Sequence, residues 1–158
     1  MSKEKIIIYT DGAAKGNPGK AGWAAVILFP QNYGDQGCVH EIGGRINHAT
    51  NNQMELTAPI EALKYLSRQG LALNEIEIVS DSKYVILGIT EWIFGWLKNN
   101  WRNTAKKPVL NRELWEELYK LNSEIKPQWT YVKGHNEDKY NERADVIATS
   151  FAEGEPVI

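Results

Sequence analysis

Two short stretches, residues 5–10 (KIIIYT) and 75–80 (EIEIVS), are rich in β-branched residues, and each is followed directly by an aspartate. Runs of this length and composition that end at turn signals predict β-strands. The first continues into Asp11 and Gly12, and the second into Asp81. Side-by-side pairing of these two strands would place Asp11 and Asp81 at one edge of a sheet, where the strand ends form a crevice.

Hydrophobic periodicity and turn residues predict the remaining elements. Further strands are expected at residues 23–29, 37–46 and 128–133. Helices are expected at residues 51–69, 82–88, 89–99, 112–124 and 141–152. The first helix would be capped by Asn51 and Asn52, Gly43 and Gly44 would mark a bulge or a close backbone approach, and residues 12–19 would be a loop. This order predicts an α/β fold with a five-stranded mixed sheet, three antiparallel strands plus two parallel ones, flanked by helices.

Length and composition exclude several classes of protein. A chain of 158 residues corresponds to one ordinary domain, and 42% hydrophobic with 24% charged residues is typical of a folded soluble protein. No stretch has the length and apolarity of a membrane span or a signal peptide. A single cysteine, Cys38, excludes an internal disulfide framework. We therefore expect a cytoplasmic protein, a monomer, with no membrane partner.

The glycine-rich residues 12–20 do not match a phosphate-binding loop. Gly19 and Lys20 would require glycine at position 14 and Ser or Thr at position 21, and both positions are alanine. The pattern GxGxxG is absent as well, and no Ser/Cys–His arrangement is evident. An enzyme acting on a small molecule is therefore the least favoured class.

Charge is distributed unevenly along the chain. The net formal charge is −2, yet residues 92–112 contain five basic side chains and no acidic one. The same stretch contains Trp92, Trp96 and Trp101, three of the six tryptophans. Positive charge interleaved with aromatic rings predicts a nucleic-acid surface. The pattern also fits a solvated helix with Trp92 and Trp96 turned into a core, and it does not decide between the two.

Four carboxylates stand where a fold can bring them together. Asp11 and Asp81 end strands, Glu55 lies in the first turns of a helix with a buried face, and Asp145 lies near the start of the last helix. Clustered carboxylates repel one another, and two divalent cations would neutralise four negative charges. Oxygen ligands without Cys or His favour Mg²⁺ or Mn²⁺, and a two-metal site suits phosphodiester cleavage. Each acid alone also fits a helix cap or a surface charge.

These acids lie within sequence blocks that resemble type 1 ribonuclease H. The blocks are residues 9–13 (YTDGA), 50–56 (TNNQMEL), 80–85 (SDSKYV), and 132–135 (VKGH) with 141–145 (NERAD). The resemblance implies a single ribonuclease H domain over residues 1–158 with that family's mixed-sheet fold. It implies a metal-dependent endonuclease that hydrolyses the RNA strand of RNA–DNA hybrids without sequence preference, leaving 3′-hydroxyl and 5′-phosphate ends.

The resemblance also assigns roles to individual residues. It implies that Asp11, Glu55, Asp81 and Asp145 are catalytic and hold two Mg²⁺ ions with substrate, with Mn²⁺ as a substitute, and that His135 assists proton transfer or product release. Residues 89–110 would form a basic protrusion that binds substrate. The implied substrate-binding residues are Gly12, Asn17, Thr50, Asn51, Asn52, Lys83, Trp92, Trp96, Lys98, Trp101, Arg102, Lys106 and Lys107.

Two positions depart from the family's pattern. His48 stands where an arginine is common, and Gly95 stands where an asparagine is common. Both changes weaken the DNA-phosphate pocket that the resemblance implies around Thr50.

Two other functions remain open at this point. One is a related nuclease that acts on DNA, such as a resolvase or integrase core, and the other is a non-catalytic module that binds hybrid or double-stranded RNA. Cleavage of hybrid in preference to duplex DNA would exclude the first. Binding without cleavage in Mg²⁺ would support the second.

Overall fold

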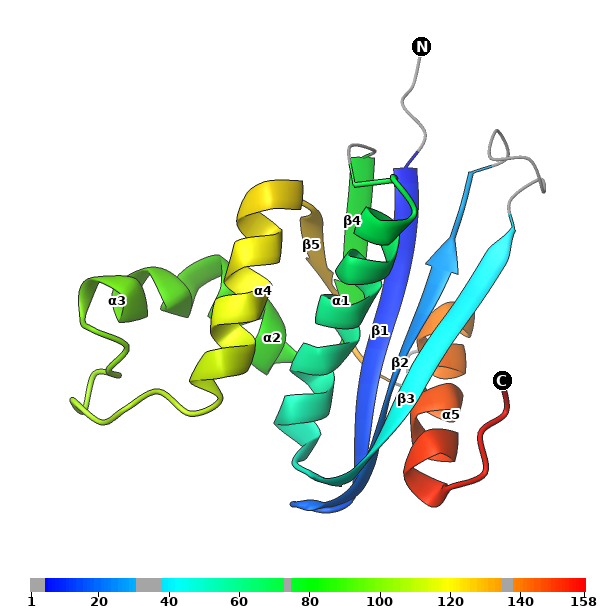
Figure 1. Cartoon of the computed structure of the whole chain (residues 1–158), viewed down its shortest axis with the longest axis horizontal. Helices are drawn as coiled ribbons and strands as arrows, with labels where there is room; N and C mark the ends of the chain where they lie inside the picture. Colours follow the sequence, from blue (N-terminus) through cyan, green and yellow to red (C-terminus); the bar gives the residue numbers. More distant parts are fainter. Residues whose placement is uncertain (1–4, 31–37, 73–74, 135–137) are drawn as a thin grey trace.

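The molecule is organised around a five-stranded mixed sheet in the order β3-β2-β1-β4-β5 (Figure 1). In the computed structural model, which describes residues 5–30, 38–72, 75–134 and 138–158, β1 to β3 are antiparallel neighbours, and β4 and β5 run parallel to β1. The expected fold class is therefore confirmed. The strands are β1 (Lys5–Gly16), β2 (Gly19–Leu28), β3 (Val39–Ala49), β4 (Glu75–Ser80) and β5 (Gln128–Tyr131).

Helices cover both faces of this sheet. They are α1 (Asn51–Arg68), α2 (Lys83–Leu87), a π-helical turn η2 (Gly88–Trp92), α3 (Ile93–Lys98), α4 (Arg112–Ile125) and α5 (Lys139–Glu153). Helices α1 and α4 lie on one face and α5 lies on the other, while α3 and its connection to α4 extend beyond the sheet (Figure 1). No helix within the described ranges has the length and apolarity needed to cross a bilayer.

Each face of the sheet has its own hydrophobic core. The larger core packs α1 and α4 against β1 through fully buried side chains such as Ile8, Leu63 and Trp115. The smaller core packs Ile147 and its alanine neighbours of α5 against Val26 of β2. Burial of these side chains is the main favourable contribution to folding, and it holds α1 and α5 on opposite sides of β1.

The loop expected at residues 12–19 is wrong, because β1 and β2 are longer than their periodicity indicates. β1 continues through Asp11 to Gly16, and β2 begins at Gly19 and pairs back along it from Gly19 to Leu28. Glycine and alanine dominate this part of both strands and have low β-propensity. Pairing between the strands overrides that preference, and the turn is confined to Asn17 and Pro18.

Helix α1 is capped by Thr50, so the expected cap at Asn51 and Asn52 is wrong. The Thr50 hydroxyl accepts a hydrogen bond from the Gln53 backbone N–H at 3.1 Å, and the Gln53 side-chain oxygen accepts one from the Thr50 N–H at 2.9 Å. This reciprocal pair is a capping box, which satisfies two backbone donors at the start of the helix. The helix then runs unbroken through Pro59 to Arg68.

The close backbone approach expected at Gly43 and Gly44 is confirmed. A Cβ atom at Gly43 would lie 2.4 Å from the ring of Phe151, and one at Gly44 would lie 2.5 Å from the indole nitrogen of Trp23. The irregularity in the pairing of β2 with β3 falls elsewhere, between Gly19 and Ala21.

We predict that Gly88→Ala destabilises the protein, because the added methyl group would lie 2.0 Å from the fully buried ring of Trp115. Overpacking of this kind costs about 1–3 kcal/mol of unfolding free energy, which corresponds to a lower melting temperature by several degrees in a chain of this size. Thermal or urea unfolding measures the change.

Gly95→Ala is the matched control, because a Cβ at Gly95 meets nothing within 4 Å. Replacing glycine by alanine at this exposed helical position is expected to be neutral or to stabilise by roughly 0.5–1 kcal/mol. Equal effects of the two substitutions would contradict the packing argument.

Candidate active site

The pairing of β1 with β4 places two carboxylates side by side. The parallel ladder ends with Thr10 opposite Ser80, so the next residues of the two strands are Asp11 and Asp81. β1 continues past this point while β4 stops, which leaves the side of β1 next to Asp11 without a paired strand. The predicted convergence of these two aspartates at one edge of the sheet is confirmed.

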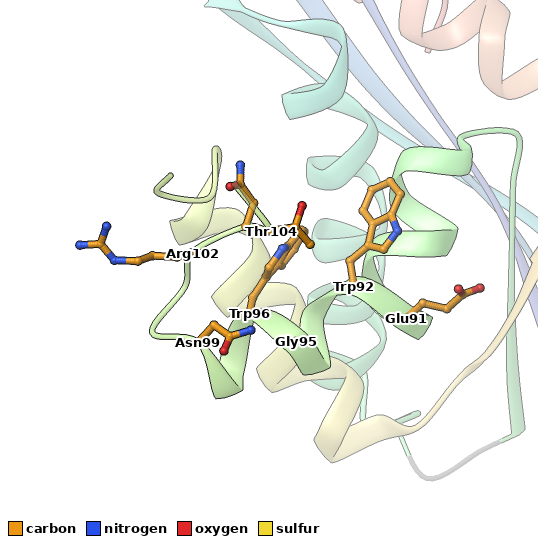
Figure 2. Close-up of a pocket in the computed structure, with 8 residues that line it drawn as sticks. Glu91, Trp92, Gly95, Trp96, Asn99, Arg102 and Thr104 are labelled. Atoms are coloured by element: carbon orange, nitrogen blue, oxygen red, sulfur yellow. The ribbon is translucent and has the colours of Figure 1, made fainter. Parts of the chain in front are cut away.

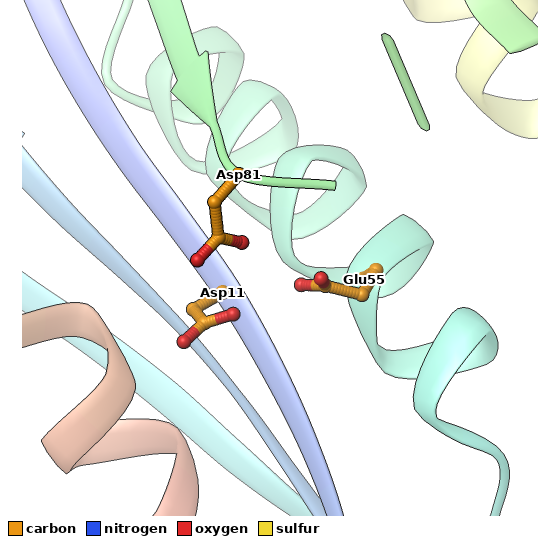
Figure 3. A group of neighbouring side chains, drawn as sticks. All are labelled: Asp11, Glu55 and Asp81. Carbon is orange, nitrogen blue, oxygen red and sulfur yellow. The ribbon is translucent and has the colours of Figure 1, made fainter. Parts of the chain in front are cut away.

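Glu55 reaches the same place because α1 crosses very close to β1. A Cβ atom at the buried Gly12 would lie 2.5 Å from the backbone nitrogen of Glu55 and 2.6 Å from the carbonyl carbon of Met54. Only glycine permits this approach without displacing the helix. The side chains of Asp11, Glu55 and Asp81 point toward one another from β1, α1 and the end of β4 (Figure 3), with one oxygen of each within 4.8 Å of the others.

Burial and mutual repulsion hold protons on this cluster. Burial raises the pKa of the Asp11 carboxyl to about 8, and the negative charge of Asp81 adds to the effect, against a hydrogen bond with Glu55 that lowers it. The pKa of Glu55 is also raised well above its usual value, first by burial and then by the charges of Asp11 and Asp81. Without a cation, ionisation of all three acids is unfavourable in free energy, because desolvation and like charges both disfavour the charged forms.

This donor set fits a divalent cation. Three carboxylates that converge within 4.8 Å supply hard oxygen ligands, and a cation would relieve the repulsion that raises the pKa values of Asp11 and Glu55. Within the described part of the chain, these three residues are the group of acidic, histidine or cysteine side chains close enough to share an ion. Which ion binds is a matter of the proposal below.

Asp145 lies beside this group and not within it. It is half-buried on α5, on the opposite face of the sheet from α1, and its negative charge contributes to the raised pKa of Asp11. The start of α5 is held by Asp138, whose side chain accepts hydrogen bonds from the N–H groups of Tyr140 and Asn141 at 3.0 and 3.1 Å. Arg143 makes a bidentate pair with Glu41 of β3 at 2.6 and 2.9 Å, so Asp145 is carried by an anchored helix. His135 lies outside the described residues.

A second group of predicted residues gathers at the N-terminus of α1. The side-chain oxygen of Asn17, in the turn between β1 and β2, accepts a hydrogen bond from the backbone N–H of Asn51 at 2.9 Å, although the two are 34 positions apart. Thr50, the cap of α1, directly precedes Asn51 and Asn52, and both asparagines are exposed. Lys83 is exposed at the start of α2, and its ammonium lies 5.6 Å from the centre of the Tyr131 ring.

The tryptophans of the protrusion form a ladder from the core to the surface. Trp115, fully buried, packs edge-on against Trp96 at 5.2 Å between ring centres, and Trp96 contacts Trp101 at 6.1 Å and Trp92 at 6.2 Å. Trp101 is buried, with the Arg112 guanidinium 5.3 Å from its ring centre. Of the three predicted contacts, Trp92 is 39% exposed. It therefore has the surface to meet a ligand, whereas Trp101 mainly anchors the segment.

Three of the basic residues of the protrusion, Arg102, Lys106 and Lys107, lie on a hydrogen-bonded loop, and Lys98 is the last residue of α3. The side-chain oxygen of Asn103 accepts hydrogen bonds from the N–H groups of Ala105 and Lys107 at 2.9 and 3.0 Å, and Arg102 donates to the Lys106 carbonyl at 3.1 Å. Lys98, Arg102, Lys106 and Lys107 are all exposed.

A hollow of about 440 Å³ lies beside this loop, next to Trp92 and Trp96 (Figure 2). Gly95 also lines the hollow, and a Cβ atom there would meet no neighbour within 4 Å. The side chain of Arg102 extends away from the tryptophans (Figure 2).

Comparison with known proteins identifies the family. The model of the ribonuclease H family matches residues 3–153. The ribonuclease H of Thermosynechococcus vestitus is 50% identical over 150 residues, which cover 95% of this chain and 90% of the relative. That of Wolbachia pipientis wMel is 51% identical over 148 residues, which cover 94% and 95%. The chain belongs to the ribonuclease H family. The expected family and enzyme class, an endoribonuclease, are confirmed.

Solved structures of ribonucleases H support the same fold. LC11-RNase H1 in complex with an RNA/DNA hybrid superposes with a TM-score of 0.67 at 30% identity, covering 94% of this chain and 97% of that one. LC9-RNase H1, a type 1 RNase H with the type 2 active-site motif, gives a TM-score of 0.84 over 98% of this chain and 75% of that one. Its identity of 22% restricts that likeness to the fold.

Four residues of this ribonuclease H for which no role was expected support the start of α1 and the protrusion. They form side-chain hydrogen bonds there and are Gln53, Tyr84, Asn103 and Asn111. A signal existed for Gln53, because Thr50-x-x-Gln53 is a capping-box pattern. The others carry no local signal, because their partners lie in distant segments or in an irregular loop.

We predict that the metal-free ribonuclease H loses stability as the pH rises. The folded pKa of Asp11, about 8, lies above its ordinary value of 3.8. The folded state therefore holds a proton that the unfolded state releases. Between about pH 4 and pH 8 the free energy of unfolding falls as pH rises, and above pH 8 this contribution is constant. Urea unfolding in chelator across that range measures the slope.

Asp11→Asn should flatten this dependence, and the raised pKa of Glu55 should keep a residual slope. Glu155→Gln, in the exposed C-terminal segment, is the control and should retain the wild-type slope. Identical slopes for wild type and Asp11→Asn would show that Asp11 ionises normally.

Proposed function

We propose that this chain hydrolyses the RNA strand of RNA–DNA hybrids with two Mg²⁺ ions, for which Mn²⁺ substitutes, and that it shows no sequence preference and leaves 3′-hydroxyl and 5′-phosphate ends. The observation that carries the proposal is the convergence of Asp11, Glu55 and Asp81, with Asp145 beside them, in a ribonuclease H fold. The Mg²⁺ ions, when bound, supply Lewis acidity for the attacking and leaving oxygens of the phosphodiester.

The chain's own residues prepare this chemistry. Burial and neighbouring negative charges raise the pKa values of Asp11 and Glu55 in the metal-free site, and a bound cation would favour their ionised forms. Asp81, at the end of β4, and Asp145, on the anchored helix α5, approach the site from two other elements. Carboxylates that come from four separate elements hold fixed positions, and rigid placement of ligands keeps the reacting groups aligned. His135, which precedes α5 in the sequence, would assist proton transfer or product release.

The two strands of the hybrid would bind to different surfaces. The RNA strand would lie along Gly12, Asn17 and Asn52 beside the carboxylates, where asparagine amides can contact a 2′-hydroxyl as donor and acceptor. The Thr50 hydroxyl oxygen accepts the cap hydrogen bond from Gln53, so its own hydrogen can be donated to a phosphate of the DNA strand. The remaining implied contacts are Asn51, Lys83, Trp92, Trp96, Lys98, Trp101, Arg102, Lys106 and Lys107.

We further propose that residues 1–158 act as one ribonuclease H domain, a cytoplasmic monomer in which residues 89–110 are the substrate-binding protrusion. LC11-RNase H1, solved with an RNA/DNA hybrid, matches 94% of this chain over 97% of its own length, which supports a single ribonuclease H domain and a hybrid as its substrate.

We predict that one labelled sequence is cut internally when presented as the RNA strand of a hybrid, and is not cut as duplex DNA, duplex RNA or single-stranded RNA. Mg²⁺ or Mn²⁺ should support cleavage and chelator should abolish it. Asp11→Asn should lower the rate by roughly 10²–10³-fold or more, as loss of a group that stabilises the transition state does. A denaturing gel shows the products.

Glu155→Gln is the control and should cut at the wild-type rate. Cleavage of duplex DNA in preference to hybrid would favour a DNA-directed nuclease. Hybrid that binds without being cut in either ion would favour a non-catalytic binding module.

We predict that the double substitution Lys106→Gln/Lys107→Gln weakens hybrid binding by reducing phosphate contacts. Each phosphate contact contributes about 0.7–0.9 to the slope of log affinity against log salt, so the slope should become shallower by about 1.4–1.8. Binding in Ca²⁺, measured across a salt series, gives the slope. Lys120→Gln, exposed on α4, is the matched control, and an equal change in that control would contradict a specific role for the protrusion.

A further inference from the structure

A chain of side-chain hydrogen bonds links the start of α1 to the base of the protrusion. The amide nitrogen of Gln53 donates to the side-chain oxygen of Asn111 at 3.2 Å, across 58 positions of sequence. The amide nitrogen of Asn111 donates to the Tyr84 hydroxyl at 3.1 Å. The indole nitrogen of Trp115 donates to the same hydroxyl at 3.0 Å. Three segments that are distant in sequence therefore meet through a single polar path.

At the α1 end, this path is part of the helix cap. The Gln53 side-chain oxygen accepts from the Thr50 N–H at 2.9 Å, while the side-chain nitrogen faces Asn111. Both ends of the amide are thus used, and its orientation is determined by its partners. Thr50 and its neighbour Asn51 are proposed contacts of the hybrid, so Gln53 lies directly behind that binding surface.

At the other end, the path holds the base of the protrusion. Asn111 ends the basic connection and begins α4 in the left-handed backbone region, with φ of 60°, which asparagine tolerates better than most residues. Tyr84 packs against Trp115 at 5.2 Å and against Trp92 at 6.2 Å between ring centres. Trp92 is the exposed end of the aromatic ladder. A shift of Tyr84 or Asn111 would therefore move both the ladder and the basic loop.

We propose that Gln53 is a positioning residue, which with Asn111 and Tyr84 holds the start of α1 and the protrusion at a constant separation, so that one hybrid contacts both surfaces at once. This inference rests on the proposed function. Two contacts on a rigid body reinforce each other, because binding at the first places the second at high effective concentration. If the separation fluctuates, long hybrids lose this advantage and short hybrids, which reach one surface, lose nothing.

The experiment compares two substitutions that break the path at opposite ends. Gln53→Met keeps the side-chain length and the hydrogen bond from the Gln53 backbone N–H to the Thr50 hydroxyl. It removes the bond to Asn111 and also the bond that the Gln53 side-chain oxygen accepts from the Thr50 N–H. Tyr84→Phe removes the shared hydroxyl and leaves the capping box untouched. Tyr119→Phe on α4 makes the same chemical change away from the path. KM and kcat are measured over a length series of hybrids, at a temperature at which every variant is fully folded.

For hybrids long enough to reach the protrusion, each substitution should raise KM roughly 3- to 10-fold, the range expected for loss of a buried neutral hydrogen bond. For the shortest hybrids KM should match wild type, and kcat should be unchanged throughout. The double variant should be no worse than either single one, because both interrupt the same path. Tyr119→Phe should follow wild type at every length.

Other outcomes separate this inference from the function on which it rests. A rise in KM that is equal for short and long hybrids, or that adds up in the double variant, would overturn the positioning role. So would an effect of Gln53→Met without one of Tyr84→Phe, which would reduce Gln53 to a helix cap. Wild-type protein that cuts no hybrid of any length would overturn the proposed function and this inference together.

Discussion

The parallel pairing of β1 with β4 is the constraint on which the rest of the structure depends. Because the parallel ladder ends at Thr10 and Ser80, Asp11 and Asp81 follow it at the same level of the sheet. After β4 ends, the chain forms α2, while β1 continues. Glu55 of α1 lies close to Asp11 at this point. Gly12 allows α1 to lie this close to β1, since any side chain at this position would clash with the α1 backbone. The position of the site thus follows from where one strand stops and its neighbour does not.

Concentrating negative charge at this position places function and stability in opposition. Asp11 and Glu55 are buried among like charges, and both conditions raise their pKa values. An apolar cluster of similar volume would suit the folded chain better, because buried charges that lack partners destabilise proteins. The same strain gives the site its affinity for a cation, since relief of repulsion becomes part of the binding free energy. The surrounding cores, anchored by Trp115 and Ile147, supply the rigidity that keeps the acids together.

The tryptophans of residues 92–101 connect the protrusion to the core. A basic stretch with aromatic residues fits either a nucleic-acid surface or a helix packed on a core, and the structure shows core packing for two of the three rings. Trp101 and Trp96 pack toward the buried Trp115, while Trp92 is partly exposed in the hollow that Arg102 also lines. Hydrogen bonds through Tyr84 and Asn111 extend the same anchor to the start of α1. The protrusion is therefore an extension of the core and not a separate arm.

The sequence predicts the fold class, the family and the convergence of Asp11 and Asp81, because strand composition, helix periodicity and collinear motifs are local properties. It did not determine that β1 continues through residues 12–16, since glycine and alanine form strand there only because β2 pairs with them. It contains the capping-box pattern Thr50-x-x-Gln53, although the cap was expected at Asn51 and Asn52, and it does not reveal the second partner of Gln53, because Asn111 is 58 residues away. The raised pKa of Asp11 and the burial of Trp101 likewise depend on neighbours from other elements. Contacts between distant segments, and the dielectric environment that they create, exist only once the chain has packed.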